Sequence, residues 1–159
     1  MKNIKIRKIQ KKDLKKLSEI YSTVYETFDV GERWTKKTSY KLLDYWLKRE
    51  PELAFLAEYK GKIVGAFVVG IKPWWDGNHL VDGEIFVHPD YQNKGIGTKL
   101  LKFTSNYALK KYKAVRFDTY TVRGKYPVKW YKSIGFKEIK EWIMITADLK
   151  KVQKNLNKR

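Results

Sequence analysis

One stretch of the sequence, residues 85–110, constrains the fold more than any other. An apolar run, Ile85-Phe86-Val87, reads as the end of a buried strand, and a polar turn follows it. Two glycines, Gly95 and Gly97, then open a segment whose apolar residues recur at helical spacing. The first amides of a helix have no partner within the helix, and the helix dipole favours negative charge there. This strand–turn–helix unit therefore predicts a pyrophosphate-binding site.

Two common glycine-rich phosphate loops do not fit this stretch. The dinucleotide fingerprint requires a third glycine where the chain has Leu100. A Walker A loop requires Gly-Lys-Ser/Thr, whereas Gly97 is followed by Thr98 and Lys99. Both loops are excluded, and the structural alternative is a flexible strand-to-helix turn that binds no ligand.

The composition favours one folded domain over residues 1–159. Hydrophobic residues make up 43% of the 159 residues and aromatic residues 15%, which suits one sizeable core. The absence of cysteine excludes disulfides, thiolate metal sites and a cysteine nucleophile, and two histidines are too few for a histidine-rich metal site. No apolar run approaches the ~20 residues of a membrane span. We expect a cytoplasmic protein without a metal and without a membrane partner.

The charge is strongly basic. Lys and Arg total 35 against 17 Asp and Glu, a formal net charge of +18. Such a field attracts polyanions, including nucleic acid, anionic lipid and polyphosphorylated cofactors, without choosing among them. The lysines are spread along the whole chain, which favours a solvated basic surface over a nucleic-acid site.

Periodicity and turn residues predict the order of the elements. Pro51 ends the second helix, and Lys60-Gly61 joins two strands in a hairpin. Residues 73–78 are predicted to form a loop, and residues 150–159 a frayed end or a loosely packed helix. Strands are expected near residues 4–9, 53–59, 62–71, 79–87, 115–121 and 138–149, and helices near 14–28, 36–49, 96–110 and 127–134.

Two motifs in this order resemble the GNAT acetyltransferase superfamily. Gln92-Asn93-Lys94-Gly95-Ile96-Gly97 is similar to its acyl-CoA motif, Gln/Arg-x-x-Gly-x-Gly/Ala, and residues 131–136 are similar to its Tyr-x-x-x-Gly-Phe segment. Gly124 stands where many relatives have an asparagine, so that one cofactor contact is not carried over. The resemblance implies an α/β (α+β) fold, with a mixed, mostly antiparallel sheet flanked by helices in the order β-α-α-β-β-β-α-β-α-β.

The resemblance also implies the activity: transfer of the acetyl group of acetyl-CoA to a primary amine by direct attack. The strand Ile85 to Val87 would pair edge-on with the pantetheine arm of coenzyme A, and the turn would bind its pyrophosphate through backbone amides. The cofactor-binding residues implied are Ile85, Phe86, Val87, Gln92, Asn93, Lys94, Gly95, Ile96, Gly97 and Thr98.

Two side chains are candidates for proton transfer in that reaction. Tyr131 is the candidate acid, since a phenol with an ordinary pKa near ~10 carries a proton for a departing thiolate. Its structural alternative is core packing with Trp130 and Phe136. Glu84 is the candidate base, directly or through water, on a strand face that we expect it to share with Asp82 and Phe86. Its alternative is a carboxylate paired with a lysine.

The family commonly has two adjacent acids at this point of the strand, whereas here Gly83 precedes Glu84. His88 is expected to belong to the turn rather than to the chemistry.

The acceptor is less constrained. Residues 25–34 and 72–79 combine acids with tryptophans, which suits a cationic amine: a small amine, a polyamine, an amino acid or a peptide or protein amine. Ordinary surface loops are the alternative. Two rival functions stay open, a basic nucleic-acid-binding domain without catalysis and an acyl-CoA-binding sensor of the same fold; a homodimer is also left open.

Overall fold

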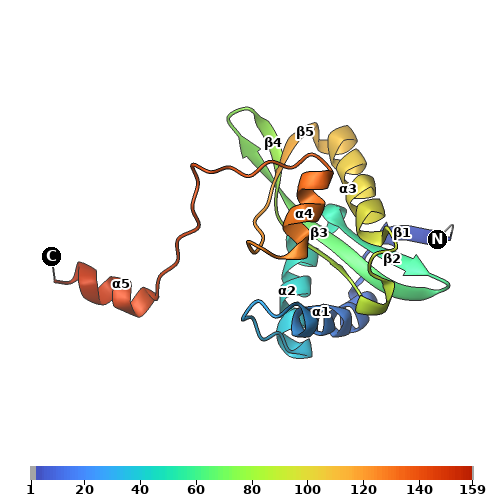
Figure 1. The fold of residues 1–159 in the computed structure, drawn as a ribbon, viewed down its shortest axis with the longest axis horizontal. Helices are drawn as coiled ribbons and strands as arrows, with labels where there is room; N and C mark the ends of the chain where they lie inside the picture. The colour runs from blue at the N-terminus through green and yellow to red at the C-terminus, as the bar shows by residue number, and fades with distance from the viewer. Residues whose placement is uncertain (1–2, 159) are drawn as a thin grey trace. The chain divides into compact units, whose positions relative to one another are not determined.

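The computed structural model describes residues 3–158, in two compact units, Met1–Tyr120 and Thr121–Arg159. The first unit holds the sheet and the long helices, and the second holds two short helices (Figure 1). Each unit is described by itself. That residues 1–159 form a single domain stays a prediction.

The first unit is built on a five-stranded sheet in the order β1-β2-β3-β4-β5. Its strands are β1 (Ile4–Lys8), β2 (Ala54–Tyr59), β3 (Lys62–Trp74), β4 (Gly77–Val87) and β5 (Ala114–Asp118). The first four strands pair antiparallel, and β5 lies parallel to β4. The predicted mixed, mostly antiparallel sheet flanked by helices is confirmed.

The long helices are α1 (Leu14–Phe28), α2 (Lys36–Arg49) and α3 (Ile96–Tyr112), as their apolar periodicity predicts. Short 3-10 turns precede α1, β2 and α3: η1 (Lys11–Asp13), η2 (Pro51–Leu53) and η3 (Pro89–Tyr91). The Thr35 hydroxyl accepts a hydrogen bond from the Thr38 amide and so caps α2. These local signals explain why the bounds of α1 and α2 follow from the sequence.

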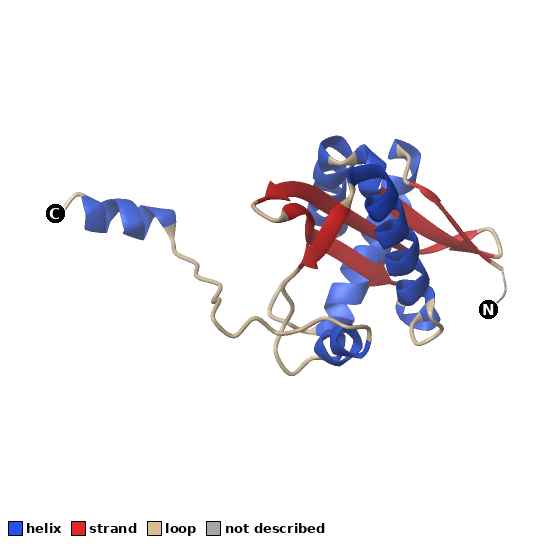
Figure 2. Ribbon diagram, turned by 90° about the horizontal axis from the view of Figure 1, so that it is seen from above, coloured by secondary structure: helices blue, strands red, loops and turns tan. Residues whose placement is uncertain are grey.

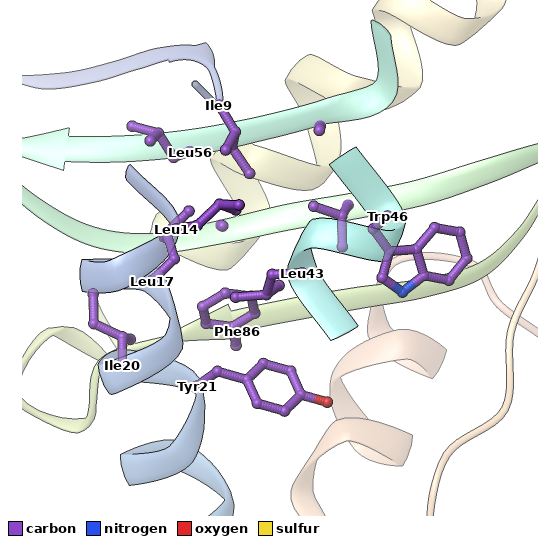
Figure 3. Packing of buried hydrophobic residues seen from close by; sticks show 12 residues of the cluster. Ile9, Leu14, Leu17, Ile20, Tyr21, Leu43, Trp46, Leu56 and Phe86 are labelled. Atoms are coloured by element: carbon purple, nitrogen blue, oxygen red, sulfur yellow. The ribbon is translucent and has the colours of Figure 1, made fainter. Parts of the chain in front are cut away.

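Neighbouring residues of β2 divide the helices between the two faces of the sheet. Leu56 belongs to a buried cluster with side chains of α1 and α2, including Leu17 and Leu43 (Figure 3). Phe55 packs instead against Phe103 of α3, with ring centroids 5.0 Å apart. Since successive side chains of a strand point to opposite faces, α3 covers one face and α1 with α2 the other (Figure 2).

The predicted loop at residues 73–78 is wrong, because the hairpin of β3 and β4 continues through it. Pro73 pairs with Asn78 and Trp74 with Gly77, which leaves Trp75 and Asp76 at the turn. The pairing of β2 with β3 reaches only Val68. Pro73 therefore lies where β3 has a neighbouring strand on one side only, a position that tolerates a residue without a backbone N–H.

The predicted strand at residues 138–149 is also wrong, and with it the last β of the expected order. Over the described residues of this segment no ladder forms, and Ile143 and Ile145 are 81% and 82% exposed. The second unit instead contains α4 (Tyr126–Ser133) and α5 (Leu149–Leu156). An alternating pattern supplies the side chains of a strand, but a strand also needs a backbone partner, which no local pattern provides.

Across residues 3–158 none of the helices has both the length and the apolar character that crossing a bilayer requires.

Candidate functional site

The strands β4 and β5 pair over only part of their length, and this opens one edge of β4. Their pairing runs from Asn78 to Val81, where Val81 faces Asp118. On its other side β4 pairs with β3 as far as Val87. From Asp82 onward, the described residues place no strand along the β5 side of β4. An open edge offers backbone groups to an extended ligand, and Ile85, Phe86 and Val87 lie along it.

A bulge in β4 lies where this open edge begins. Val68 pairs with Glu84 but Gly70 pairs with Val81, so β4 carries one residue more than β3 across the shift. Asp82 lies within the bulge with a φ of 54°. The predicted alternation of Asp82, Glu84 and Phe86 on one face is therefore interrupted at Asp82.

Glu84 is held by two tyrosines of α1. The Tyr21 hydroxyl donates to Glu84 Oε2 at 3.0 Å, and the Tyr25 hydroxyl is 3.4 Å from the same oxygen. Burial raises the pKa of Glu84 to about 7, although both hydroxyls act in the opposite direction. Among the ion pairs of the described residues none includes Glu84, so pairing with a lysine is not what this carboxyl does.

Packing accounts for the glycine that precedes Glu84. A Cβ at Gly83 would lie 2.7 Å from Cε2 of Phe67 and 3.0 Å from Cγ2 of Val69. Real Cβ atoms do not approach other atoms so closely, so a side chain at this position, such as the second acid that the resemblance leads us to expect, has no room here. Glu84 is left as a lone acid at this point of the strand.

The turn after β4 is fixed by its own side chains. The Gln92 side-chain amide donates to the Val87 carbonyl at 2.9 Å, and His88 Nδ1 accepts the Asp90 amide at 3.3 Å. The Lys94 ammonium reaches the Asp90 carbonyl at 2.5 Å. Gln92 and Lys94 thus hold the shape of the turn, and His88 caps its 3-10 segment.

The backbone of the turn then forms a concave cradle, defined here as residues 93–98. Asn93 and Gly95 are left-handed, with φ of 58° and 75°, and no atom lies within 4 Å of where a Gly95 Cβ would be. The Lys99 amide donates to the Gly95 carbonyl at 3.0 Å. Within the described chain, the amides from Asn93 to Gly97 have no backbone acceptor outside the helix. Bare successive amides at a helix start suit a diphosphate.

Tyr131 lies on α4 in the second unit, whereas Glu84 and the cradle lie in the first. Its ring centroid is 4.8 Å from those of Trp130 and Phe136. The Phe136 amide donates to the Tyr131 carbonyl at 3.1 Å, which folds the chain back after the helix. Gly135 permits this return with a φ of 103°.

The two predicted acceptor loops differ in what their acids do. Trp34 donates its indole N–H to Glu32 at 2.7 Å, and its ring lies 5.3 Å from that of Tyr21. Trp34 thus packs against Tyr21, one of the two tyrosines that bind Glu84. In the other loop, Asp76 accepts from Arg116 at 2.8 Å and contacts His79 at 2.7 Å. Asp76 is therefore already bonded to two residues of the sheet.

Tyr21 and Tyr25 are the partners of Glu84 that the sequence did not predict. The helical pattern places Tyr21 among the apolar residues of α1, and its ring is buried as that pattern predicts. The signal was available in its chemistry, because a buried tyrosine hydroxyl needs a hydrogen-bond partner. Which partner it finds depends on a strand 63 residues away.

Over the described residues no group of three or more histidines or acids is placed to hold a metal ion.

The sequence matches the model of the acetyltransferase (GNAT) family over residues 14–136, which include strands β2 to β5, the cradle and Tyr131. The chain belongs to the acetyltransferase (GNAT) family. The predicted family resemblance is thereby confirmed.

Relatives of this GNAT chain include an uncharacterized N-acetyltransferase of Methanocaldococcus jannaschii, 31% identical over 150 residues. That match covers 90% of this chain and 66% of the relative, so the chain spans just under two thirds of its length.

Solved structures share the fold. A possible acetyltransferase from Clostridium difficile 630 matches with a TM-score of 0.75 and 18% identity, over 91% of this chain and 97% of that one. A predicted acetyltransferase from Clostridium acetobutylicum, solved with acetyl-CoA, matches with a TM-score of 0.68 and 21% identity, over 91% and 96%.

Proposed function

We propose that this GNAT protein is an N-acetyltransferase that moves the acetyl group of acetyl-CoA to a primary amine by direct attack. The observation that carries the proposal is the place of Glu84 on β4, the strand with the open edge. Burial there raises the pKa of the Glu84 carboxyl to about 7. A group that titrates near neutral pH can take a proton and release it again under working conditions.

The first unit offers a binding surface that fits coenzyme A. The open edge at residues 85–87 would pair with the pantetheine amides, and the cradle would bind the pyrophosphate through the backbone amides of residues 93–97. Gly95 leaves the approach clear, since no side chain projects there. Acetyl-CoA would supply the acetyl thioester.

Transfer forms an N–C bond and breaks a C–S bond, so one proton must leave the amine and one must reach the thiolate. Glu84 would take the amine proton, directly or through water, because its Oε1 accepts no hydrogen bond from the described residues. Tyr131 would hold or deliver the proton for the thiolate.

The side chains around Glu84 favour a cationic acceptor. Tyr25 and Trp34 have ring centroids 6.0 Å apart, and Glu32 adds a carboxylate beside them. Aromatic faces with a nearby acid attract ammonium groups, which supports a polyamine, an amino acid or a peptide amine as the acceptor class.

The test is a thiol-release assay with acetyl-CoA against spermidine, free amino acids and short peptides. We expect release with at least one amine, and at least a ten-fold loss of kcat/KM at pH 7.5 in Glu84→Gln. Glu141→Gln changes an exposed carboxylate outside both predicted acceptor segments and serves as the control. Coenzyme A binding without release from any amine would instead support an acyl-CoA sensor. Salt-steep RNA or DNA binding without coenzyme A affinity would support the nucleic-acid rival.

A further inference from the structure

The Tyr21 side chain is buried and packed against two other aromatic rings. Its ring is 1% exposed and lies edge-on to Phe86, with centroids 5.1 Å apart. It also stacks on Tyr25 at 4.6 Å. Figure 3 shows the ring projecting from α1 and lying beside Phe86. A ring packed in this way has lost its rotamer freedom on folding, so its hydroxyl occupies one place.

The hydroxyl at that place always has a proton to donate. Burial and then the charge of Glu84 raise the pKa of Tyr21 well above its usual range, so the phenol keeps its proton at every working pH. A buried hydroxyl is costly unless it is bonded, and Glu84 Oε2 at 3.0 Å is its partner. Tyr25 reaches the same oxygen at 3.4 Å, and Oε1 receives neither bond.

We propose that Tyr21 is a positioning residue for the reaction: its hydroxyl binds Oε2 of Glu84 and so turns Oε1 toward the proton to be taken. This inference rests on the proposed function of Glu84 as the base. It adds that the base is oriented from α1, by a residue that needs no contact with either substrate.

The groups facing Glu84 divide into two sets with opposite effects on its ionisation. Burial disfavours the carboxylate, as do the charges of Glu32 and Asp82, while the hydroxyls of Tyr21 and Tyr25 favour it. Tyr120 also senses Glu84, since burial and then this carboxylate raise the pKa of its phenol. Removing the Tyr21 hydroxyl takes away the nearer of the two donors that favour the carboxylate, so the pKa of Glu84 should rise.

The test compares Tyr21→Phe with Tyr25→Phe, because each variant removes one hydroxyl and keeps its ring. Carbon-13 NMR of side-chain-labelled glutamate, assigned with Glu84→Gln, gives the Glu84 titration midpoint without any need for activity. We expect Tyr21→Phe to raise the midpoint by about one pH unit, the size of a hydrogen bond to a charged group. Tyr25→Phe, which loses the longer contact, should raise it by less than half as much.

The kinetic readout is the pH profile of kcat/KM with the amine found in the release assay. In Tyr21→Phe the acid limb should move to higher pH together with the NMR midpoint. An unmoved midpoint, or a shift no larger than that of Tyr25→Phe, overturns the role of Tyr21. A moved midpoint with an unmoved limb overturns Glu84 as the base, and with it the positioning role.

A measurement on the wild-type protein covers the case in which Tyr21→Phe does not fold. With ring carbon Cζ of tyrosine labelled, the Tyr21 signal should titrate at the Glu84 midpoint, because its hydroxyl bonds to that carboxyl. Tyr59, on β2, is the internal control and should not follow it. A Tyr21 signal that stays flat through the midpoint overturns the inference whether or not any amine is acetylated.

Discussion

Burial of Glu84 predicts that this protein loses stability as the pH rises, and that Glu84→Gln removes the loss. The folded-state pKa is raised from 4.5 to about 7. A raised carboxyl pKa means that the folded protein holds the proton more tightly than the unfolded chain does. The stabilising contribution of the protonated form is therefore complete below pH 4.5, and it is lost as the pH rises toward and through 7.

The size of the effect follows from the same two values. Each unit by which the folded pKa exceeds the unfolded one corresponds to about 1.4 kcal/mol, so the loss is about 3 kcal/mol. That is a large part of the roughly 5–15 kcal/mol by which single domains are stable. Glutamine keeps the shape and can still accept the Tyr21 hydroxyl, but it has no proton to lose.

Urea unfolding at pH 4.5 and pH 8 measures this directly. We expect the free energy of unfolding of the wild type, relative to Glu84→Gln, to fall by about 3 kcal/mol between the two conditions. Other titrating groups, such as His79, occur in both proteins and cancel in the difference. Glu26→Gln, an exposed change on α1, should track the wild type at both pH values. A difference that varies by less than about 1 kcal/mol would show that Glu84 is not buried as described.

Three further predictions concern packing, cofactor binding and catalysis. Gly65→Ala should destabilise the protein by about 1–3 kcal/mol in urea unfolding, because the new Cβ would lie 2.5 Å from the Phe86 carbonyl oxygen. Gly70→Ala, whose Cβ contacts would be 3.4 Å, should destabilise it less. Equal effects of the two changes would contradict this packing. Gly97→Asp should raise the Kd for coenzyme A at least ten-fold by calorimetry, since a carboxylate would face the phosphates; unchanged binding would refute the cradle. Tyr131→Phe should lower kcat at least ten-fold with an unchanged far-UV spectrum, and full turnover in a folded variant would remove its role.

The parts of the fold that the sequence predicts are those with local causes. The bounds of α1 and α2 follow from apolar spacing, with Thr35 capping and Pro51 ending α2. The cradle is local as well, because the bare amides belong to a helix start and the left-handed Gly95 precedes it. Where a strand needed a backbone partner the outcome differed: residues 73–78 continue the hairpin of β3 and β4, and the described residues of 138–149 form no ladder.

The sequence by itself therefore determined the order of the elements as far as α4, the strand–turn–helix unit at residues 85–110 and the presence of an acid, Glu84, on the strand that enters it. Only the tertiary structure decided what that acid can do. The pairing of β4 with β5 ends at Val81 and leaves the edge of β4 open, and α1 brings the Tyr21 hydroxyl to Glu84 across 63 residues of chain. The physical reason is that a pKa depends on burial and on hydrogen bonds, and both are set by residues that meet only when the chain is folded.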